Sequence, residues 1–285
     1  MLLLDIPYTS PPSARLTLDL HVHDSETKTK PLIVFVRGGA WIADDKSNHR
    51  ELAARLSAAT GCAVAVPNYS LSGPRNQPAD SSELIQHPTH TSDVLRAFEF
   101  LRTWNGQPPE PSATSVDQLP YYNAEAIFAI GQSCGAHILG TMLLSPSESS
   151  SPSVAPSDSL LRAVRGVITT EGIFDIDLLL QSFPPYRGWF IESAFGASET
   201  YRDVSVNNFT ARSTRIPWLL IHSTGDTLVD QVQSSTMYDR LRLLHGDDGS
   251  LVAKDWDGFD QEHDDVVKSE KFPTVVSDFV RTYSP

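Results

Sequence analysis

The sequence predicts an α/β fold with a mostly parallel central sheet and helices on both faces. Short, wholly apolar runs such as Ala126 to Ile130 are typical of parallel strands that are covered on both sides. These runs alternate with segments of helical period, and the order strand, helix, strand favours right-handed parallel crossovers. A chain of 285 residues, 40% of them hydrophobic, is long enough for one such domain, so we expect residues 1–285 to form a single domain.

Composition and charge exclude several classes of function. The formal net charge is −13 and no cluster of Lys and Arg stands out, which argues against a nucleic-acid or membrane partner. The N-terminus lacks the basic start of a signal peptide, and no apolar run approaches the length of a membrane span. Cys62 and Cys134 each lie in or beside an expected buried element, so we expect no disulfide. We therefore expect a cytoplasmic protein that acts on a small molecule. Its oligomeric state stays open, and a homodimer is one of the alternatives.

The first half of the chain supplies the early strands and helices. Residues 15–23 alternate apolar and polar side chains, which is typical of an antiparallel edge strand. Apolar runs at 32–36 and 63–67 predict buried strands. Segments 48–59 and 91–104 are expected to be helices, the second with apolar residues at helical spacing. His21 and His23 share one face of the first strand, but no third ligand is near, so we expect no metal site.

The second half continues the alternation. Strands are expected at 164–169, 217–222 and 251–256, and helices at 231–244 and 272–283.

Three segments are predicted additions to this core. Residues 106–120 and 145–159 are rich in Ser and Pro and predict surface insertions. Residues 171–195 are dense in aromatic side chains, which plain core packing explains for the most part. A lid over an apolar pocket, at about 176–212, is the functional alternative. Candidate pocket residues are Trp41, Phe174, Trp189 and Phe190.

The stretch from Ala124 to Leu144 indicates a nucleophile. It predicts a strand, a sharp turn and a helix, and Gly131 to Gly135 fits G-x-S-x-G at the turn. Flanking glycines relieve the clashes of a strained turn that lifts the Ser133 hydroxyl above the sheet, at the positive end of the helix. The pentapeptide occurs by chance in many chains, but a buried strand before it and a helix after it are the context that the motif requires.

A serine nucleophile needs a base, and the base needs an acid that fixes its tautomer. In this kind of sheet the partners follow in the order serine, acid, histidine. Asp226 lies just past a late strand and is the candidate acid, with Asp230 as the alternative, although Asp230 is explained by helix capping. His263 lies between the last strand and the closing helix and is the candidate base, whereas His245 precedes that strand.

The tetrahedral intermediate needs preorganised donors for its oxyanion. The backbone N–H after the nucleophile belongs to Cys134. A second source is the loop Gly38-Gly39-Ala40, which directly follows a buried strand and whose glycines let the backbone approach a substrate. An ordinary glycine turn is the alternative explanation of this loop.

Together these motifs resemble the α/β-hydrolase fold, and within it the kynurenine formamidase (arylformamidase) group and its esterase relatives. The resemblance rests on an early HGG-x-W-like loop, a G-x-S-x-G-A-H elbow, a late H-S-x-x-D-x-L-V segment and a terminal E-H-D-D-V. Residues 166–175 also look like the family's stretch after the elbow helix, and the similarity runs from about Leu16 to Val280. It implies Ser133, Asp226 and His263 as the triad.

Two residues depart from the family pattern. Gln132 is a mild change, whereas Arg37 replaces the family's histidine at the head of the glycine loop. Our hypothesis is that Arg37 braces this loop by bonding backbone carbonyls or a carboxylate such as Asp44 or Asp45. The alternative is that Arg37 enters the pocket and binds an anionic group of the substrate.

The resemblance implies a serine hydrolase that cleaves a small formamide, N-formylkynurenine, to give kynurenine and formate. A general carboxylesterase is the alternative, because nothing in the triad distinguishes an amide from an ester. A catalytically silent binding protein on the same fold is a third hypothesis. We expect no cofactor, since the glycine pattern after the first strands is not G-x-G-x-x-G.

Overall fold

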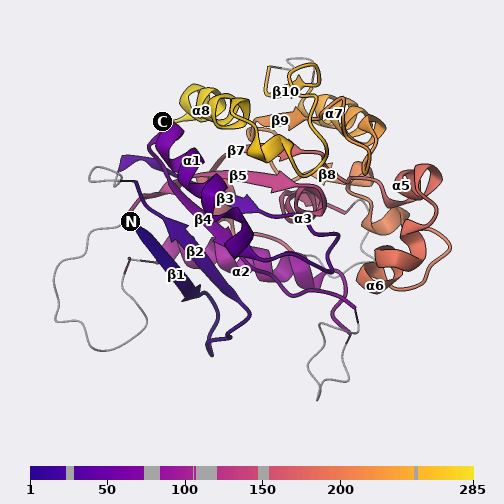
Figure 1. Cartoon of the computed structure of the whole chain (residues 1–285), viewed down its shortest axis with the longest axis horizontal. Coiled ribbons are helices and arrows are strands. Elements are labelled where there is room, and N and C mark those ends of the chain that lie inside the picture. The colour runs from indigo at the N-terminus through magenta and orange to yellow at the C-terminus, as the bar shows by residue number, and fades with distance from the viewer. Residues whose placement is uncertain (24–28, 74–83, 105, 107–120, 147–153, 247–249) are drawn as a thin grey trace.

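The computed structural model describes residues 1–23, 29–73, 84–104, 106, 121–146, 154–246 and 250–285. Within these residues, an eight-stranded sheet runs through the centre of the molecule, with helices on both of its faces (Figure 1). The strands lie side by side in the order β1-β2-β4-β3-β5-β7-β9-β10. The expected α/β fold is therefore confirmed.

The sheet is mostly parallel. From β4 through β3, β5, β7 and β9 to β10, every neighbouring pair is parallel, whereas β2 pairs antiparallel with both β1 and β4. The central strands β3, β4 and most of β5 are buried, as their continuous apolar runs predict. The strands are β1 (Leu2–Pro7), β2 (Thr17–His21), β3 (Pro31–Val36), β4 (Ala63–Pro67), β5 (Asn123–Gln132), β7 (Val164–Thr170), β9 (Trp218–Ile221) and β10 (Val252–Asp255).

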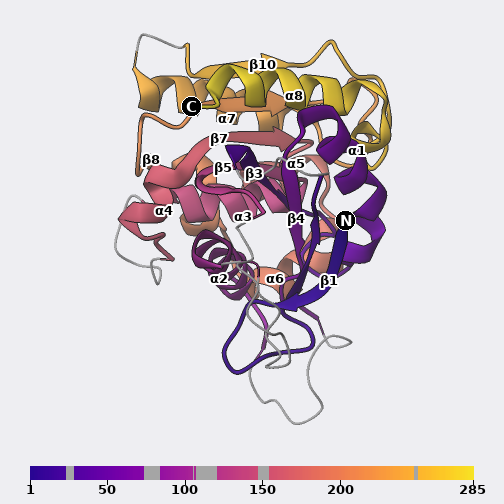
Figure 2. The same ribbon diagram turned by 90° about the vertical axis from the view of Figure 1, so that its left-hand side faces the viewer.

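Helices form two layers. On one face α1 (Arg50–Thr60) packs against α8 (Lys271–Tyr283), and their apolar side chains form one core with β3, β5 and β7. On the other face α2 (Thr89–Thr103), α3 (Cys134–Leu143), α4 (Asp158–Ala163) and α7 (Gln231–His245) close a second core. Figure 2 shows the strands between α8 above and α2 and α3 below. No helix in the described ranges combines the length and apolar character needed to cross a membrane.

One strand expectation was wrong. The segment at 15–23 does form an antiparallel strand, β2, but β2 is not an edge strand, because β1 pairs with its outer side. The side chains of Thr17 to Leu20 are all buried. Asp19 is one of them, and it forms ion pairs with Lys46 at 2.8 Å and Arg50 at 2.8 Å. Asp19 is therefore accounted for by buried ion pairing rather than by a solvent-exposed face.

Of the three predicted additions, the structure describes mainly the segment 176–212. Most of the insertion predicted at 106–120, and residues 147–153 of the one at 145–159, fall outside the described residues. The segment 176–212 contains α5 (Ile176–Ser182), a π-helical turn η3 (Arg187–Ile191), α6 (Glu192–Phe195) and the short turns η4 (Arg202–Val204) and η5 (Val206–Asn208). It ends in β8 (Thr210–Ala211), which pairs with β6 (Leu144–Ser145). Figure 1 shows α5 and α6 together at one end of the molecule.

Candidate active site

Ser133 stands at the turn between β5 and α3. Its backbone has φ 52° and ψ −122°, a left-handed conformation that non-glycine residues rarely adopt. The flanking glycines make the turn feasible. A Cβ on Gly131 would lie 2.8 Å from the Ala136 backbone, and one on Gly135 would lie 2.1 Å from the Val36 carbonyl oxygen. The sharp elbow predicted from G-x-S-x-G is therefore present, with Ser133 as its strained residue.

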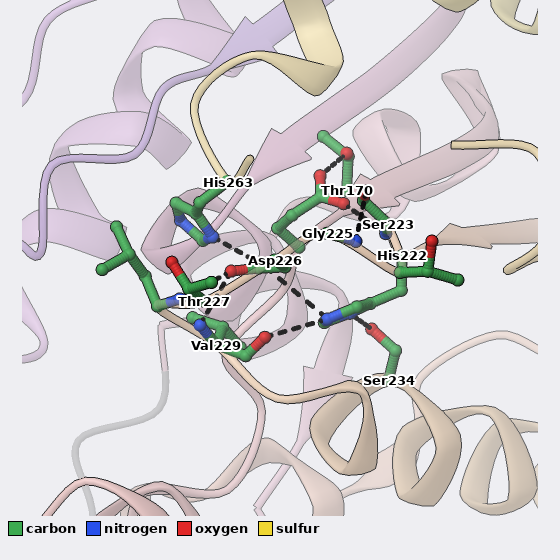
Figure 3. Close-up of polar contacts among 12 residues, drawn as sticks. Thr170, His222, Ser223, Gly225, Asp226, Thr227, Val229, Ser234 and His263 are labelled. Carbon is green, nitrogen blue, oxygen red and sulfur yellow. Dashed lines mark hydrogen bonds and ion pairs between the residues drawn. The ribbon is translucent and has the colours of Figure 1, made fainter. Parts of the chain in front are cut away.

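Asp226 and His263 come together at the same edge of the sheet. The Nδ1 atom of His263 lies 2.8 Å from Oδ2 of Asp226 (Figure 3). The other carboxylate oxygen of Asp226 accepts hydrogen bonds from the backbone N–H groups of Leu228 at 2.8 Å and Val229 at 2.9 Å. This arrangement fixes the carboxylate and leaves Nε2 as the imidazole nitrogen for proton transfer.

The environment of His263 raises the pKa of its imidazole above the ordinary value. Burial lowers the pKa of its imidazole, but the hydrogen bond and the charge of Asp226 outweigh burial, so the net pKa is raised. The side chain is also largely sequestered, since His263 is only 5% exposed.

The alternative partners serve other roles. His245 bonds the carbonyl oxygens of Leu241 and Ile216, at the C-terminal end of α7. Asp230 stands at the N-cap position of α7, but its side chain makes no capping bond and instead contacts the hydroxyl of Ser182 in α5. The expected capping role of Asp230 was therefore wrong.

The other two histidines of interest are structural. His222 bonds Ser234 at 2.8 Å and the Val229 carbonyl at 3.0 Å, which holds the acid-bearing loop against α7 (Figure 3). Burial lowers its pKa. His137 is fully buried in α3 and bonds the carbonyl oxygen of Val204 at 2.8 Å.

The glycine loop lies directly against Ser133. A Cβ on Gly38 would come within 3.1 Å of Ser133 Cβ and 3.8 Å of Ser133 Oγ. Gly39 has φ 100°, and a Cβ there would lie 2.2 Å from the Ala43 carbonyl oxygen. The loop is tied to the elbow because the backbone N–H of Trp41 donates to Cys134 Sγ at 3.3 Å.

Arg37 is buried beneath this loop, at 1% exposure. Its Nη1 donates to the carbonyl oxygen of Ala43 at 2.8 Å and to that of Gly38 at 3.3 Å, and its Nε donates to Asn68 Oδ1 at 3.2 Å. The guanidinium also lies 4.2 Å from the centre of the Tyr69 ring. Arg37 therefore bonds carbonyls as in the bracing hypothesis, and the carboxylate of Asp45 is reached only through Asn68, at 2.6 Å.

The four candidate pocket residues lie in different environments. Phe174 is fully buried, and its ring fills the space beside Gly172, where a Cβ would lie 2.4 Å from it. Trp189 is 59% exposed on the segment predicted as a lid. Trp41 and Phe190 are buried with ring centres 6.1 Å apart. A separate hollow of about 390 Å³ opens beside the glycine loop, lined by Gly38, Gly39, Gln132, His49, Asp264 and Lys268 among others.

Glu171 is a candidate site residue that the sequence reasoning missed. It directly follows β7, its backbone has φ 50°, and its side chain is fully buried. Its carboxylate accepts from the backbone N–H of Ser223 at 2.8 Å and also contacts the Thr170 hydroxyl. Burial raises its pKa to about 7, although these bonds and the nearby His263 favour the ionised form. Its position after a buried strand, at the same sheet edge as Ser133, was the available signal.

Comparison with known proteins places the chain in a family and identifies similar sequences. The BD-FAE family matches residues 18–241. A kynurenine formamidase from Meyerozyma guilliermondii is 24% identical over 274 residues, covering 93% of this chain and 89% of that protein. A probable isoprenylcysteine alpha-carbonyl methylesterase from Oryza sativa subsp. japonica is 26% identical, over 80% of this chain and 50% of that protein.

Solved structures share the fold. Esterase B from Lactobacillus rhamnosis, in an inhibited form, superposes with a TM-score of 0.73 at 14% identity, covering 99% of this chain and 86% of that one. A truncated carbohydrate esterase from gut microbiota gives a TM-score of 0.73 at 17% identity, covering 100% of this chain and 96% of that one.

Proposed function

The chain belongs to the BD-FAE family of α/β-hydrolases, and from this premise we propose that it is a serine hydrolase with Ser133, His263 and Asp226 as its catalytic triad. The observation that carries the proposal is the convergence of two features at one sheet edge. Ser133 occupies a strained elbow after β5, and His263 is hydrogen-bonded to Asp226 at 2.8 Å beyond β9 and β10.

The reaction begins with proton transfer from the Ser133 hydroxyl to Nε2 of His263. The serine oxygen attacks the carbonyl carbon of the substrate, and the carbonyl oxygen becomes an oxyanion. Asp226 stabilises the imidazolium through Nδ1. The imidazolium then protonates the departing amine or alcohol, and an acyl-enzyme remains. His263 next activates a water molecule, which releases the acid and restores the serine.

Backbone N–H groups of the glycine loop and of Cys134 are the proposed oxyanion donors. Among the loop residues, Ala40 is the weakest candidate, because its N–H and that of Trp41 both approach the buried Cys134 thiol. We therefore favour Gly38, Gly39 and Cys134. Bracing by Arg37 supports this assignment, since it holds the carbonyls of the same loop.

The substrate we propose is a small formamide, N-formylkynurenine, which would be cleaved to kynurenine and formate in the cytoplasm during tryptophan breakdown. Two curated relatives are kynurenine formamidases, and one aligns over nearly its whole length. A carboxylesterase is the second candidate, favoured by the methylesterase relatives and the esterase structures. We do not favour a silent binding protein, because the intact Asp226–His263 pair would then have no purpose.

The segment 176–212 is proposed as a lid over the substrate. Two contacts support this role. The Tyr186 hydroxyl donates to the carbonyl oxygen of Leu228 at 3.1 Å, and Ser182 contacts Asp230, so the segment lies over the loop that carries Asp226. Phe190 and Phe195 of the same segment reach Trp41 of the glycine loop.

Labelling with a fluorophosphonate probe tests the proposed nucleophile. We expect wild type to be labelled and the folded Ser133→Ala variant to remain unlabelled. Turnover of N-formylkynurenine, formanilide and p-nitrophenyl acetate then ranks formamide against ester. A kcat/KM for N-formylkynurenine at least tenfold above that for the ester supports the formamidase, and the reverse order supports the esterase. Labelling of Ser133→Ala equal to wild type would overturn the triad.

A further inference from the structure

Glu171 connects three loops at the carboxyl edge of the sheet. Its own backbone N–H donates to the carbonyl oxygen of Ile221 at 3.2 Å, and its carboxylate accepts from the N–H of Ser223 at 2.8 Å. It therefore joins the end of β7 to the loop that follows β9. That loop carries Asp226 three residues after Ser223.

Ser223 extends this connection to the loop that carries His263. Its hydroxyl donates to the carbonyl oxygen of Gln261 at 2.6 Å and accepts from the N–H of Gly225 at 3.1 Å. The two loops are in close contact, because a Cβ on Gly225 would lie 2.2 Å from the carbonyl oxygen of Asp260. A displacement of Ser223 would therefore move Asp226 and His263 together.

A neutral acceptor would suffice for one backbone N–H, yet the chain buries a carboxyl group here. Burying a carboxyl without an opposite charge in contact is unfavourable, and the left-handed backbone of Glu171 adds strain. Such features persist where the surrounding structure and a function require them. The described residues include no Lys or Arg in an ion pair with Glu171, so the cation that it can stabilise is the imidazolium of His263.

We propose that Glu171 is a positioning residue that holds the Asp226 and His263 loops in register and, as an anion, stabilises the protonated His263 formed during catalysis. This inference rests on the proposed serine hydrolase function. Its chemistry is electrostatic, and Glu171 exchanges no proton with the substrate.

The charges around Glu171 define what its ionisation does. His263 faces it from the loop before η6 (Val266–Lys268), and Asp226 faces it from the loop after β9. His222 lies 3.6 Å from Asp226 and burial lowers its pKa, and Asp264 adds a second negative charge near His263. The pKa of Glu171 is about 7 and the pKa of His263 is raised, and because the two groups interact, their ionisations are coupled.

Glu171→Gln tests the charge, because the amide oxygen can still accept from Ser223. We expect the midpoint of the acid limb of kcat/KM to fall by about one pH unit, since the nearby anion no longer raises the pKa of His263. The acid limb of wild type should reflect the coupled ionisations of Glu171 and His263, whereas that of Glu171→Gln should reflect His263 alone. Plateau kcat should fall by up to about tenfold, which corresponds to that pKa change. The matched control is Glu125→Gln, an exposed glutamate at the opposite end of β5, whose pH profile should equal that of wild type.

A second measurement does not depend on turnover. In the Ser133→Ala protein, NMR titration of His263 with and without Glu171→Gln reports the imidazole pKa directly, with the signal assigned by its loss in His263→Ala. The same downward shift is expected. An unshifted His263 in a folded Glu171→Gln protein would overturn the inference while leaving the triad intact. Turnover that survives Ser133→Ala would instead overturn the proposed function, and the two failures are therefore distinguishable.

Discussion

Replacing Arg37 with methionine tests whether the buried guanidinium braces the glycine loop or binds the substrate. Methionine keeps much of the length and removes the charge and the donors. Of the three acceptors of Arg37, Gly38 O keeps the Tyr69 hydroxyl at 2.8 Å and Asn68 Oδ1 keeps the Lys46 N–H at 2.9 Å. Among the described residues, no second donor contacts the carbonyl oxygen of Ala43, so this acceptor loses its hydrogen bond in Arg37→Met.

The magnitude follows from these bonds. Hydrogen bonds to charged groups contribute roughly 1.5–3 kcal/mol each, but the desolvation of the buried guanidinium offsets part of this sum. We expect the free energy of unfolding to fall by about 2–4 kcal/mol, which lowers Tm by roughly 4–8 °C in a domain of this size. Removing an oxyanion donor outright costs about 10²–10³ in rate, so a displaced loop should cost less, on the order of tenfold in kcat.

The assay compares substrates with and without a carboxylate, N-formylkynurenine and formanilide. Bracing predicts that Arg37→Met lowers kcat for both by similar factors, within about twofold of each other, because the oxyanion position is shared. The exposed Arg215→Met serves as the charge-matched control and should leave both unchanged. A loss confined to the carboxylated substrate and expressed in KM would refute the bracing role.

The remaining predictions concern the triad, its pH dependence and the lid. Asp226→Asn and His263→Ala should each lower kcat by about 10⁴-fold or more. The kcat of Asp230→Asn and of His245→Ala should stay within about threefold of wild type. Steady-state kinetics on the folded variants measures all four. Because neutral His263 is the proposed base and its pKa is raised above 6.5, kcat/KM should fall as pH drops through a value above 6.5, and a midpoint below 6.5 would contradict the raised pKa. Tyr186→Phe removes the bond to the Leu228 carbonyl and should raise KM about threefold with kcat nearly unchanged, as measured on N-formylkynurenine, and an equal loss in kcat would argue for a catalytic contact instead.

The fold and the elbow could be predicted because local signals and long-range structure agree. The apolar runs of β3, β4 and β5 are buried on both faces, which is the condition under which a short apolar run marks a parallel strand. The elbow glycines are required by contacts that any strand–turn–helix of this shape would make. Both features depend on residues that are close together in the chain, so the local sequence is enough to predict them.

Features that depend on which loops meet in space could not be predicted in this way. The alternating polar residues of 15–23 suggested an exposed edge, since nothing local reveals that Asp19 would meet Lys46 and Arg50. Glu171 was overlooked for the same reason, because its partner Ser223 lies 52 residues away. The donor geometry of arginine suggested that Arg37 braces the loop. That Asn68 lies between Arg37 and Asp45 could be seen only in the folded structure.

Backbone strain gathers at the sheet edge that carries the candidate site, independently of any motif. Among the described non-glycine residues, positive φ occurs at Asp5, Ala40, Trp41, Asp44, Ser133 and Glu171. Asp5 lies at a register irregularity of the edge strand β1. The other five follow β3, β5 and β7, three neighbouring strands, at their carboxyl ends. Each such residue costs roughly 1–3 kcal/mol, and this strain is tolerated because the strand ends that lead into it are buried. In an open α/β sheet the carboxyl edge is where ligands bind, so the strain accumulates where the proposed nucleophile, oxyanion loop and Glu171 must be held against relaxation.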